Sequence, residues 1–203
     1  MKIALIGATG SVGSRVLAEL LSRGHEVTGL SRHPEKLTPQ ERLKSVQGDI
    51  AKPDELGAAL HGHDAVISSV RFLTYNVADL LAAVKASEAG RLVVVGGAGS
   101  LKVASGQLLA DTPAFPAAAK PEADAGKKVL EALRGESALN WTFVSPSALF
   151  APGERTGHYR LGEDILIVGE DGKSRISQED YAIALVDELE SAKHPRQRIT
   201  VGY

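Results

Sequence analysis

The chain has 203 residues, of which 43% are hydrophobic and 24% charged, and its formal net charge at pH 7 is −2. These values fit a soluble globular protein of one domain, and they provide no basic surplus for nucleic acid or for an anionic membrane surface. The chain contains no cysteine, which excludes disulfides, thiolate nucleophiles and cysteine-bound zinc.

The start of the chain indicates where the protein resides. Residues 2–6 are an apolar run that Gly7 and Thr9 interrupt, which is typical of a buried strand and not of a signal peptide. No apolar run approaches the roughly 20 residues that span a bilayer. We therefore expect a cytoplasmic protein without membrane partners.

Short, β-branched apolar runs recur along the chain and predict strands that are covered on both faces. They lie at 2–6, 26–30, 64–70, 91–97 and 141–145, with a weaker one at 44–48. Helical patterns separate several of them, starting near Val12, Asn76, Pro121 and Ser177. This alternation predicts an α/β fold, a Rossmann-like doubly wound parallel sheet with helices on both faces.

Two irregular segments interrupt the alternation. Residues 100–120 are rich in Ala, Pro and Gly and predict a loop over the site. Residues 150–175 contain a second such loop and a short apolar run at 165–168 that reads as a strand. We interpret 150–175 as a small C-terminal substrate cap on a single domain that covers 1–203.

The stretch GATGSVG places Gly7, Gly10 and Gly13 between the first strand and the first helix. Such glycines allow a sharp turn, let the backbone approach a pyrophosphate and pack the helix closely on the strand. The N-terminus of the helix adds free N–H groups and a partial positive charge. We therefore predict a dinucleotide-binding loop, of which a simple packing turn is the alternative. The residues expected to contact the dinucleotide are Gly7, Thr9, Gly10, Ser11, Val12 and Gly13.

Four stretches carry a family resemblance: GATGSVG, GDI at 48–50, VVVGGAGS at 93–100 and WTFVSPSALFAPGERTGHYRLG at 141–162. With them the chain resembles the atypical short-chain dehydrogenases/reductases over essentially its whole length. The most similar subgroup is the NmrA-like NAD(P)H-binding proteins of the NADH-flavin reductase group. The resemblance implies cofactor contacts beyond the glycine loop, at Asp49, Ile50, Ser68, Ser69, Val70, Gly96 and Pro146.

The residues after the second strand predict which nucleotide is bound. An NAD-specific site usually has an acidic residue there, which holds the ribose 2′-OH. This chain has Arg32 at that place and Lys36 within reach, and both suit a 2′-phosphate. We therefore expect NADP(H) to be preferred over NAD(H). The alternatives are that both cations face solvent, or that Glu35 holds the ribose.

The catalytic residues are less evident than the cofactor loop. Classical relatives use Tyr-x-x-x-Lys, in which the tyrosine protonates the developing alkoxide. Lys120 stands before the helix near Pro121, but Pro116 precedes it by four residues and no tyrosine has a lysine four residues on. Lys120 and Ser100 are the remaining catalytic candidates. Their alternatives are a ribose contact or solvent exposure for Lys120, and a local loop bond for Ser100.

Without that tyrosine, reduction of a ketone is disfavoured. A flavin-like or quinone-like acceptor spreads the added charge and takes its proton from solvent, so hydride transfer needs mainly proximity and orientation. We predict an NAD(P)H-dependent reductase of such a small-molecule acceptor, acting as a monomer or homodimer. The alternative is a non-catalytic NADP(H)-sensing regulator of NmrA type.

Other polar residues have weaker interpretations. Arg155 either holds an anionic group or pairs with a carboxylate that fixes its loop. His158 and Tyr159 lie in the predicted cap, where they could contact substrate. His61 and His63 are too few to predict a metal site.

Overall fold

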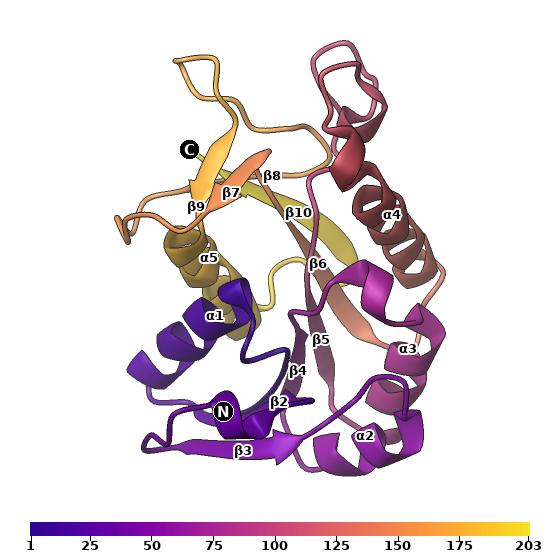
Figure 1. The fold of residues 1–203 in the computed structure, drawn as a ribbon, viewed down its shortest axis with the longest axis vertical. Coiled ribbons are helices and arrows are strands. Elements are labelled where there is room, and N and C mark those ends of the chain that lie inside the picture. Colours follow the sequence, from indigo (N-terminus) through magenta and orange to yellow (C-terminus); the bar gives the residue numbers. More distant parts are fainter.

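The predicted strands pair into one eight-stranded sheet in the computed structural model, which describes residues 1–203 (Figure 1). Its order is β3-β2-β1-β4-β5-β6-β10-β8, and only the β8–β10 pair is antiparallel. The predicted Rossmann-like α/β fold is thus confirmed. The strands are β1 (Lys2–Ile6), β2 (Glu26–Ser31), β3 (Leu43–Gln47), β4 (Ala65–Ser68), β5 (Arg91–Val95), β6 (Asn140–Pro146), β8 (Arg160–Gly162) and β10 (Gln197–Gly202).

Strand β1 lies at the point where the order of the sheet reverses. It pairs with β2 on one side and with β4 on the other. Chains that leave the carboxyl ends of β1 and β4 diverge to opposite faces, which opens a crevice between them. In sheets of this kind ligands bind at that crevice.

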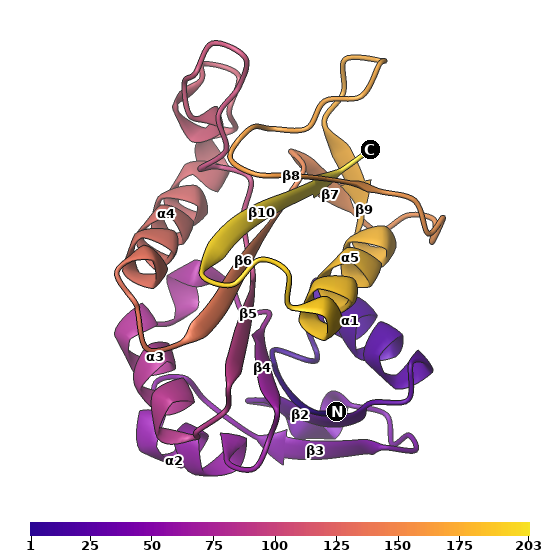
Figure 2. The ribbon, with the colours of Figure 1, turned by 180° about the vertical axis from the view of Figure 1, so that it is seen from behind.

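Helices cover both faces of the sheet, as Figures 1 and 2 show. One face packs against α1 and α5, and the other against α2, α3 and α4, each through a separate apolar cluster. Their bounds are α1 (Ser11–Ser22), α2 (Pro53–Leu60), α3 (Val77–Ala86), α4 (Lys120–Arg134) and α5 (Gln178–Ser191).

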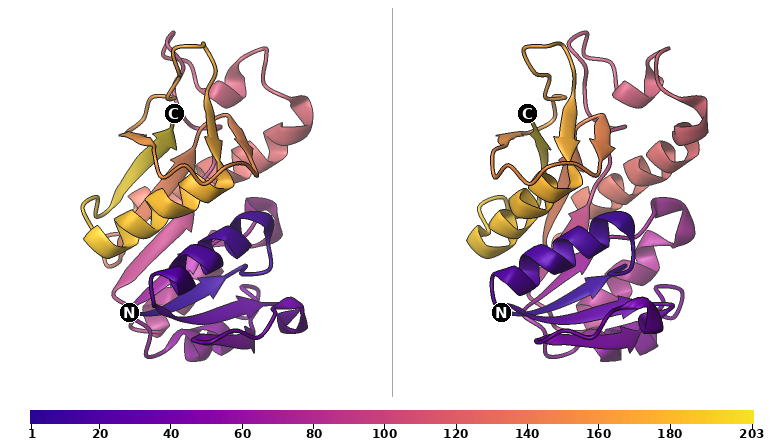
Figure 3. Two further views of the ribbon diagram at one scale, coloured as in Figure 1. Left: turned by 90° about the vertical axis from the view of Figure 1, so that its left-hand side faces the viewer. Right: turned by 60° about the vertical axis from the view of Figure 1, so that its left-hand side comes forward.

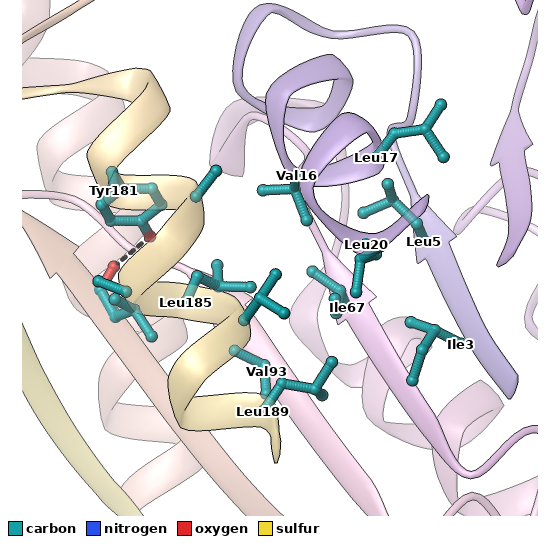
Figure 4. Packing of buried hydrophobic residues seen from close by; sticks show 14 of the residues in the cluster. Ile3, Leu5, Val16, Leu17, Leu20, Ile67, Val93, Tyr181, Leu185 and Leu189 are labelled. Carbon is teal, nitrogen blue, oxygen red and sulfur yellow. Dashed lines mark hydrogen bonds between the residues drawn. The ribbon is translucent and has the colours of Figure 1, made fainter. Parts of the chain in front are cut away.

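The pairing of α1 with α5 buries apolar side chains that are close in space and far apart in the sequence (Figure 4). Val16 and Leu20 of α1 and Leu185 of α5 are fully buried in one cluster. Fully burying a side chain of this size contributes about 1.5–3 kcal/mol. The hydroxyl of Tyr181 donates to the carbonyl oxygen of Val144 at 2.6 Å, so α5 is also tied to β6.

A buried ion pair holds the other end of α5 against the sheet. The guanidinium of Arg91 lies 2.6 Å from the carboxylate of Glu188, and both residues are nearly inaccessible to solvent. Glu188 also accepts hydrogen bonds from the side chains of His194 and Thr142. These additional donors offset the cost of removing the pair from water.

The structure adds elements that were not predicted and corrects one that was. Helix α2 begins at Pro53, which suits the first turn of a helix, and β10 carries the β-branched run around Ile199. The strand predicted at 165–168 is wrong. There, only Ile165 makes an isolated bridge, to Lys102, and Ile165 and Val168 are exposed. The run has no neighbouring strand to complete a ladder.

The segment between β6 and α5 (residues 147–177), here called the cap segment, folds back over the end of α5 (Figure 3). Its strands β7 (Leu149–Ala151) and β9 (Arg175–Ser177) form a small parallel pair. Asp180 in α5 fixes it by accepting hydrogen bonds from the hydroxyl of Thr156 at 2.6 Å and from the N–H of Gly157 at 2.8 Å.

Further contacts bind the cap segment to the helices. Tyr203, which follows β10, links the two: its hydroxyl donates to Asp180 at 2.7 Å and its N–H donates to the carbonyl of Arg175 at 3.0 Å. Arg155 makes two hydrogen bonds of 3.1 Å to the carboxylate of Glu19 in α1. Of the two interpretations of Arg155, the structure therefore shows the pairing with a carboxylate. Tyr159 donates to Asp187 in α5, so its hydroxyl is engaged in the same way.

These contacts predict how the cap segment responds to a change at Asp180. Burial alone would raise the pKa of Asp180, but the hydrogen bonds from Thr156, Tyr203 and Gly157 outweigh it and lower the pKa below its usual range. The stabilisation is therefore present above the ordinary aspartate pKa of about 3.9 and is lost as pH falls through the lower folded value. We expect Asp180→Asn to lose it at neutral pH and to speed amide exchange in 153–157.

Hydrogen-exchange mass spectrometry measures this effect at one fixed pH. Asp54→Asn is the matched control, because Asp54 is exposed and makes no side-chain hydrogen bond. Its exchange in 153–157 should equal that of the unaltered chain. Equal exchange in the Asp180→Asn variant would contradict the anchoring role.

Candidate functional site

The turn after β1 can be formed only by glycine at two positions. Gly7 has a φ of +86°, and a Cβ on it would lie 2.4 Å from the carbonyl oxygen of Ser69. A Cβ on Gly13 would lie 2.0 Å from the carbonyl oxygen of Gly7. The loop is closed by a hydrogen bond from the N–H of Gly10 to the carbonyl of Gly7 at 3.0 Å. The helix therefore starts directly against the end of β1.

The N-terminus of α1 presents unused donors to the crevice. Gly10 is the N-cap and has no side chain to bond them, and the first turn contains no acidic residue. The N–H groups of Ser11, Val12 and Gly13 have no acceptor in the protein. Together with the partial positive charge of the helix end, they suit an anionic group such as a phosphate. Thr9 is exposed beside them.

The end of β4 lies against this loop. The carbonyl of Ser69 and the side chain of Val70 are the atoms that a side chain on Gly7 would meet. The hydroxyl of Ser68 is buried and lies beside the buried hydroxyl of Tyr75. The structure therefore brings the predicted residues at 68–70 to the glycine loop, on the side of the crevice formed by β4.

The end of β2 carries the residues predicted to select the nucleotide. Arg32 and Lys36 are both exposed, and neither side chain makes an ion pair or hydrogen bond within the protein. Glu35 is instead 3.2 Å from the ring of His33. The hydroxyl of Ser31, immediately before Arg32, is buried and unpartnered, and sequence analysis missed it.

Asp49 and Ile50 follow β3 beside this edge. The N–H of Gly48 donates to the carbonyl of Ser31 at 3.0 Å, which places the start of this loop next to the end of β2. Asp49 accepts from the N–H of Ala51 at 3.0 Å, and Ile50 is buried in the cluster beneath α2 and α3.

Gly96 and Pro146 close the crevice on the other side. A Cβ on Gly96 would lie 2.5 Å from the ring of Phe143, and its N–H donates to the carbonyl of Val144 at 2.8 Å. Pro146 ends β6 and is buried. Both residues lie at the carboxyl ends of their strands, at the same edge of the sheet as the glycine loop.

The two catalytic candidates have partners within the protein. The hydroxyl oxygen of Ser100 accepts a hydrogen bond from the guanidinium of Arg198 at 3.2 Å. The ammonium of Lys120 donates to the carbonyl of Ala110 at 2.9 Å and pairs with Asp111 at 3.3 Å. Both contacts stabilise the loop at 100–120. Their roles in catalysis stay predictions.

None of the four tyrosines has a lowered pKa. Burial raises the pKa of Tyr75, Tyr159, Tyr181 and Tyr203, and the carboxylates of Glu122 near Tyr75 and of Asp187 near Tyr159 add to the effect. A tyrosine that acts as general acid near neutral pH needs a lowered pKa. The structure therefore offers no substitute for the missing Tyr-x-x-x-Lys pair.

The features at this edge fit a dinucleotide. The glycine turn places the end of α1 against β1 and β4, the first three N–H groups of that helix lack acceptors, and the buried hydroxyl of Ser31 lies at this edge without a partner in the protein. Residues 7–192 match the model of a family described as NAD(P)H-binding. The chain belongs to this NAD(P)H-binding family.

Individual relatives extend the comparison over the full length. The chain is 39% identical to YwnB of Bacillus subtilis (strain 168), over 99% of this chain and 98% of YwnB. A crystal structure from Bacteroides thetaiotaomicron, named "putative epimerase", has a TM-score of 0.94 at 44% identity, covering 100% of this chain and 96% of that one. The "putative NADH-flavin reductase" of Streptococcus pneumoniae TIGR4 has a TM-score of 0.82 at 38% identity, covering 100% and 99%.

No helix of the protein combines the length and apolar character that crossing a membrane requires.

The glycine loop predicts a sharp effect of one methyl group. In Gly13→Ala the new Cβ meets backbone, so α1 must move away from β1 and its N–H groups leave the phosphate. Losing one charge-assisted hydrogen bond costs about 1.5–3 kcal/mol, so NADPH should bind about ten-fold more weakly or worse. Calorimetric titration measures the affinity. Gly90→Ala is the control, because a Cβ there meets nothing within 4 Å; equal affinities in the two variants would contradict the prediction.

Proposed function

We propose that the protein is an NADP(H)-preferring reductase that transfers hydride to a flavin-like or quinone-like acceptor. The observation that carries the proposal is the glycine turn with the unpaired N–H groups of α1, in a chain that lacks Tyr-x-x-x-Lys. The likeness to the "putative NADH-flavin reductase" of Streptococcus pneumoniae supports the choice of acceptor.

The chemistry of the acceptor explains why no tyrosine is required. When bound, NADPH supplies a hydride, which is two electrons and one proton. Addition of hydride to a ketone gives an alkoxide with a localised charge, which needs a positioned acid. A flavin or quinone delocalises the added charge and takes a proton from water. The protein then has to bind, orient and partly desolvate the reactants.

Ser100 can assist this reaction as a hydrogen-bond donor. Arg198 has only donors, so the contact between them uses the oxygen of Ser100 as acceptor. The proton of the Ser100 hydroxyl therefore stays available, and no atom of the protein accepts it. In our proposal it is offered to a carbonyl oxygen of the acceptor, and Lys120 orders the neighbouring loop.

The nucleotide preference rests on Arg32 and Lys36. Both are exposed at the end of β2 and have no partner in the protein, so binding a phosphate breaks no existing contact. Glu35, the residue that could have held a ribose hydroxyl, is beside His33 instead. Two exposed cations without partners favour a 2′-phosphate over a 2′-hydroxyl.

A nucleotide-sensing regulator without turnover is the second candidate. The same tyrosine arrangement favours it, because such a protein needs the cradle and no proton donor. The cap segment exposes Leu149, Leu161, Ile165 and Val168, so its surface does not separate the two candidates.

A turnover assay separates the two candidates. We expect NADPH oxidation in the presence of FMN, riboflavin or a soluble quinone to exceed the rate without protein, and a simple ketone to give none. Tight NADPH binding with no turnover of any acceptor would instead establish the regulator. Ketone reduction as fast as quinone reduction would contradict the argument from the tyrosines.

The preference for NADPH is tested by Arg32→Ala. Loss of a charge-assisted hydrogen bond of about 1.5–3 kcal/mol should lower the affinity for NADPH about ten-fold or more and leave the affinity for NADH nearly unchanged. Fluorescence titration of both nucleotides measures the two affinities. Lys193→Ala is the control, because Lys193 is an exposed cation after α5 that makes no ion pair, and it should leave the ratio unchanged. If the unaltered protein binds NADH more tightly than NADPH, the role of Arg32 is wrong.

A further inference from the structure

The glycine loop makes one side-chain contact with the far end of the sequence. Ser11, the first residue of α1, donates its hydroxyl to the side-chain oxygen of Gln178, the first residue of α5, at 2.8 Å. Their separation in sequence is 167 residues. The N-termini of α1 and α5 therefore meet at the phosphate cradle, on the face that Figure 3 presents.

Gln178 is buried, and only one of its two polar side-chain atoms has a hydrogen-bond partner in the protein. Its exposed fraction is 7%, and its amide oxygen is bonded to Ser11 while its amide nitrogen donates to nothing in the protein. If the amide were turned around, its nitrogen would donate to Ser11 and the hydroxyl of Ser11 would be released. In the observed orientation both amide N–H groups lack an acceptor in the protein, and in the turned orientation one N–H and the hydroxyl of Ser11 lack one.

The neighbours of Gln178 are already committed to the cap segment. The hydroxyl of Ser177 caps α5 by accepting from the N–H of Asp180. Glu179 accepts from Arg15 and from the N–H of Gly153, and Asp180 accepts from the cap segment. Gln178 contacts Ser11 and Glu179 contacts Arg15, so both residues face α1. Of the residues in this turn, Gln178 is the one that keeps an unused side-chain donor beside the N-terminus of α1.

We propose that Gln178 is a dinucleotide-binding residue, which with Ser11 donates a hydrogen bond to the pyrophosphate held at the end of α1. Three properties support this. The N–H groups at 11–13 lack acceptors, and the side chain of Gln178 is hydrogen-bonded to the hydroxyl of Ser11, the first of these residues. The amide N–H groups of Gln178 are unused donors, which an anion can accept. The site thus draws on α5 as well as on the glycine loop. The inference rests on nucleotide binding alone and not on the proposed reduction of an acceptor.

The variant Gln178→Glu tests the proposal without disturbing the fold. A glutamate still accepts the hydroxyl of Ser11, and an acidic residue in the first turn of a helix is favourable. It lacks the amide donor and places a negative charge beside the phosphates. We expect the affinity for NADPH, measured by calorimetry, to fall about ten-fold or more, with an unchanged thermal midpoint of unfolding. Gln178→Leu should also weaken binding, and by less.

Gln197→Glu is the matched control. It makes the same substitution at an exposed residue that begins β10, at the opposite end of that strand from the crevice. It should bind NADPH as tightly as the unaltered protein. NADPH affinity equal to that of the control in both Gln178→Glu and Gln178→Leu would overturn the proposal and leave Gln178 as a tie between two helices.

A double-mutant cycle tests whether the pair acts as one unit. Ser11→Ala and Gln178→Leu should each lower the affinity for NADPH. The double variant should lose little more affinity than the single variant with the larger loss. Losses in affinity that multiply would mean that the two side chains act independently, which contradicts the proposed shared donor. All of these measurements stay valid if no acceptor is ever reduced.

Discussion

The structure depends on how closely the backbone of α1 approaches the end of β1. No atom fits between Gly13 and the carbonyl of Gly7, and none fits between Gly7 and the carbonyl of Ser69. Because both gaps are closed, the helix begins within the crevice between β1 and β4 and not beyond it. Its free N–H groups therefore reach the one place on the sheet where the chain diverges to both faces. The positions of the other residues predicted to contact the cofactor follow from this position of the helix.

The second half of the protein is held to this centre by bonds of unequal strength. The pair of Arg91 and Glu188 is buried, so the loss of one partner would leave a charge without compensation, at a cost of about 3–5 kcal/mol. Pairs on the surface, such as that of Arg134 with Glu131, contribute about 0–1 kcal/mol. Asp180 lies between these extremes and is buried among neutral donors. The orientation of α5 is thus set by the core, and that of the cap segment by bonds to several carboxylates of α1 and α5, among which Asp180 is the most buried.

The sequence predicted what local pattern determines and failed where distant residues decide. The glycine spacing and the strands before 146 were readable because burial on both faces leaves a continuous apolar signature. The run at 165–168 has the same signature, and only the absence of a neighbouring strand prevents it from forming one. The start of α2 was signalled by Pro53 and the acidic residues after it, which the apolar pattern alone did not use. The partners of Ser100 and Gln178 are 98 and 167 residues away, so no local pattern could show them.

The long separation between α1 and α5 also bears on how the chain is made. During synthesis the apolar face of α1 emerges early, and the helix that covers it emerges last among the helices. Until then Val16, Leu17 and Leu20 have only the sheet to pack against, on a nascent chain that is still incomplete. Contacts between such distant segments form slowly, and the exposed surface invites association with other chains. The apolar cluster of the nucleotide-binding half is therefore completed only after α5 has been synthesised.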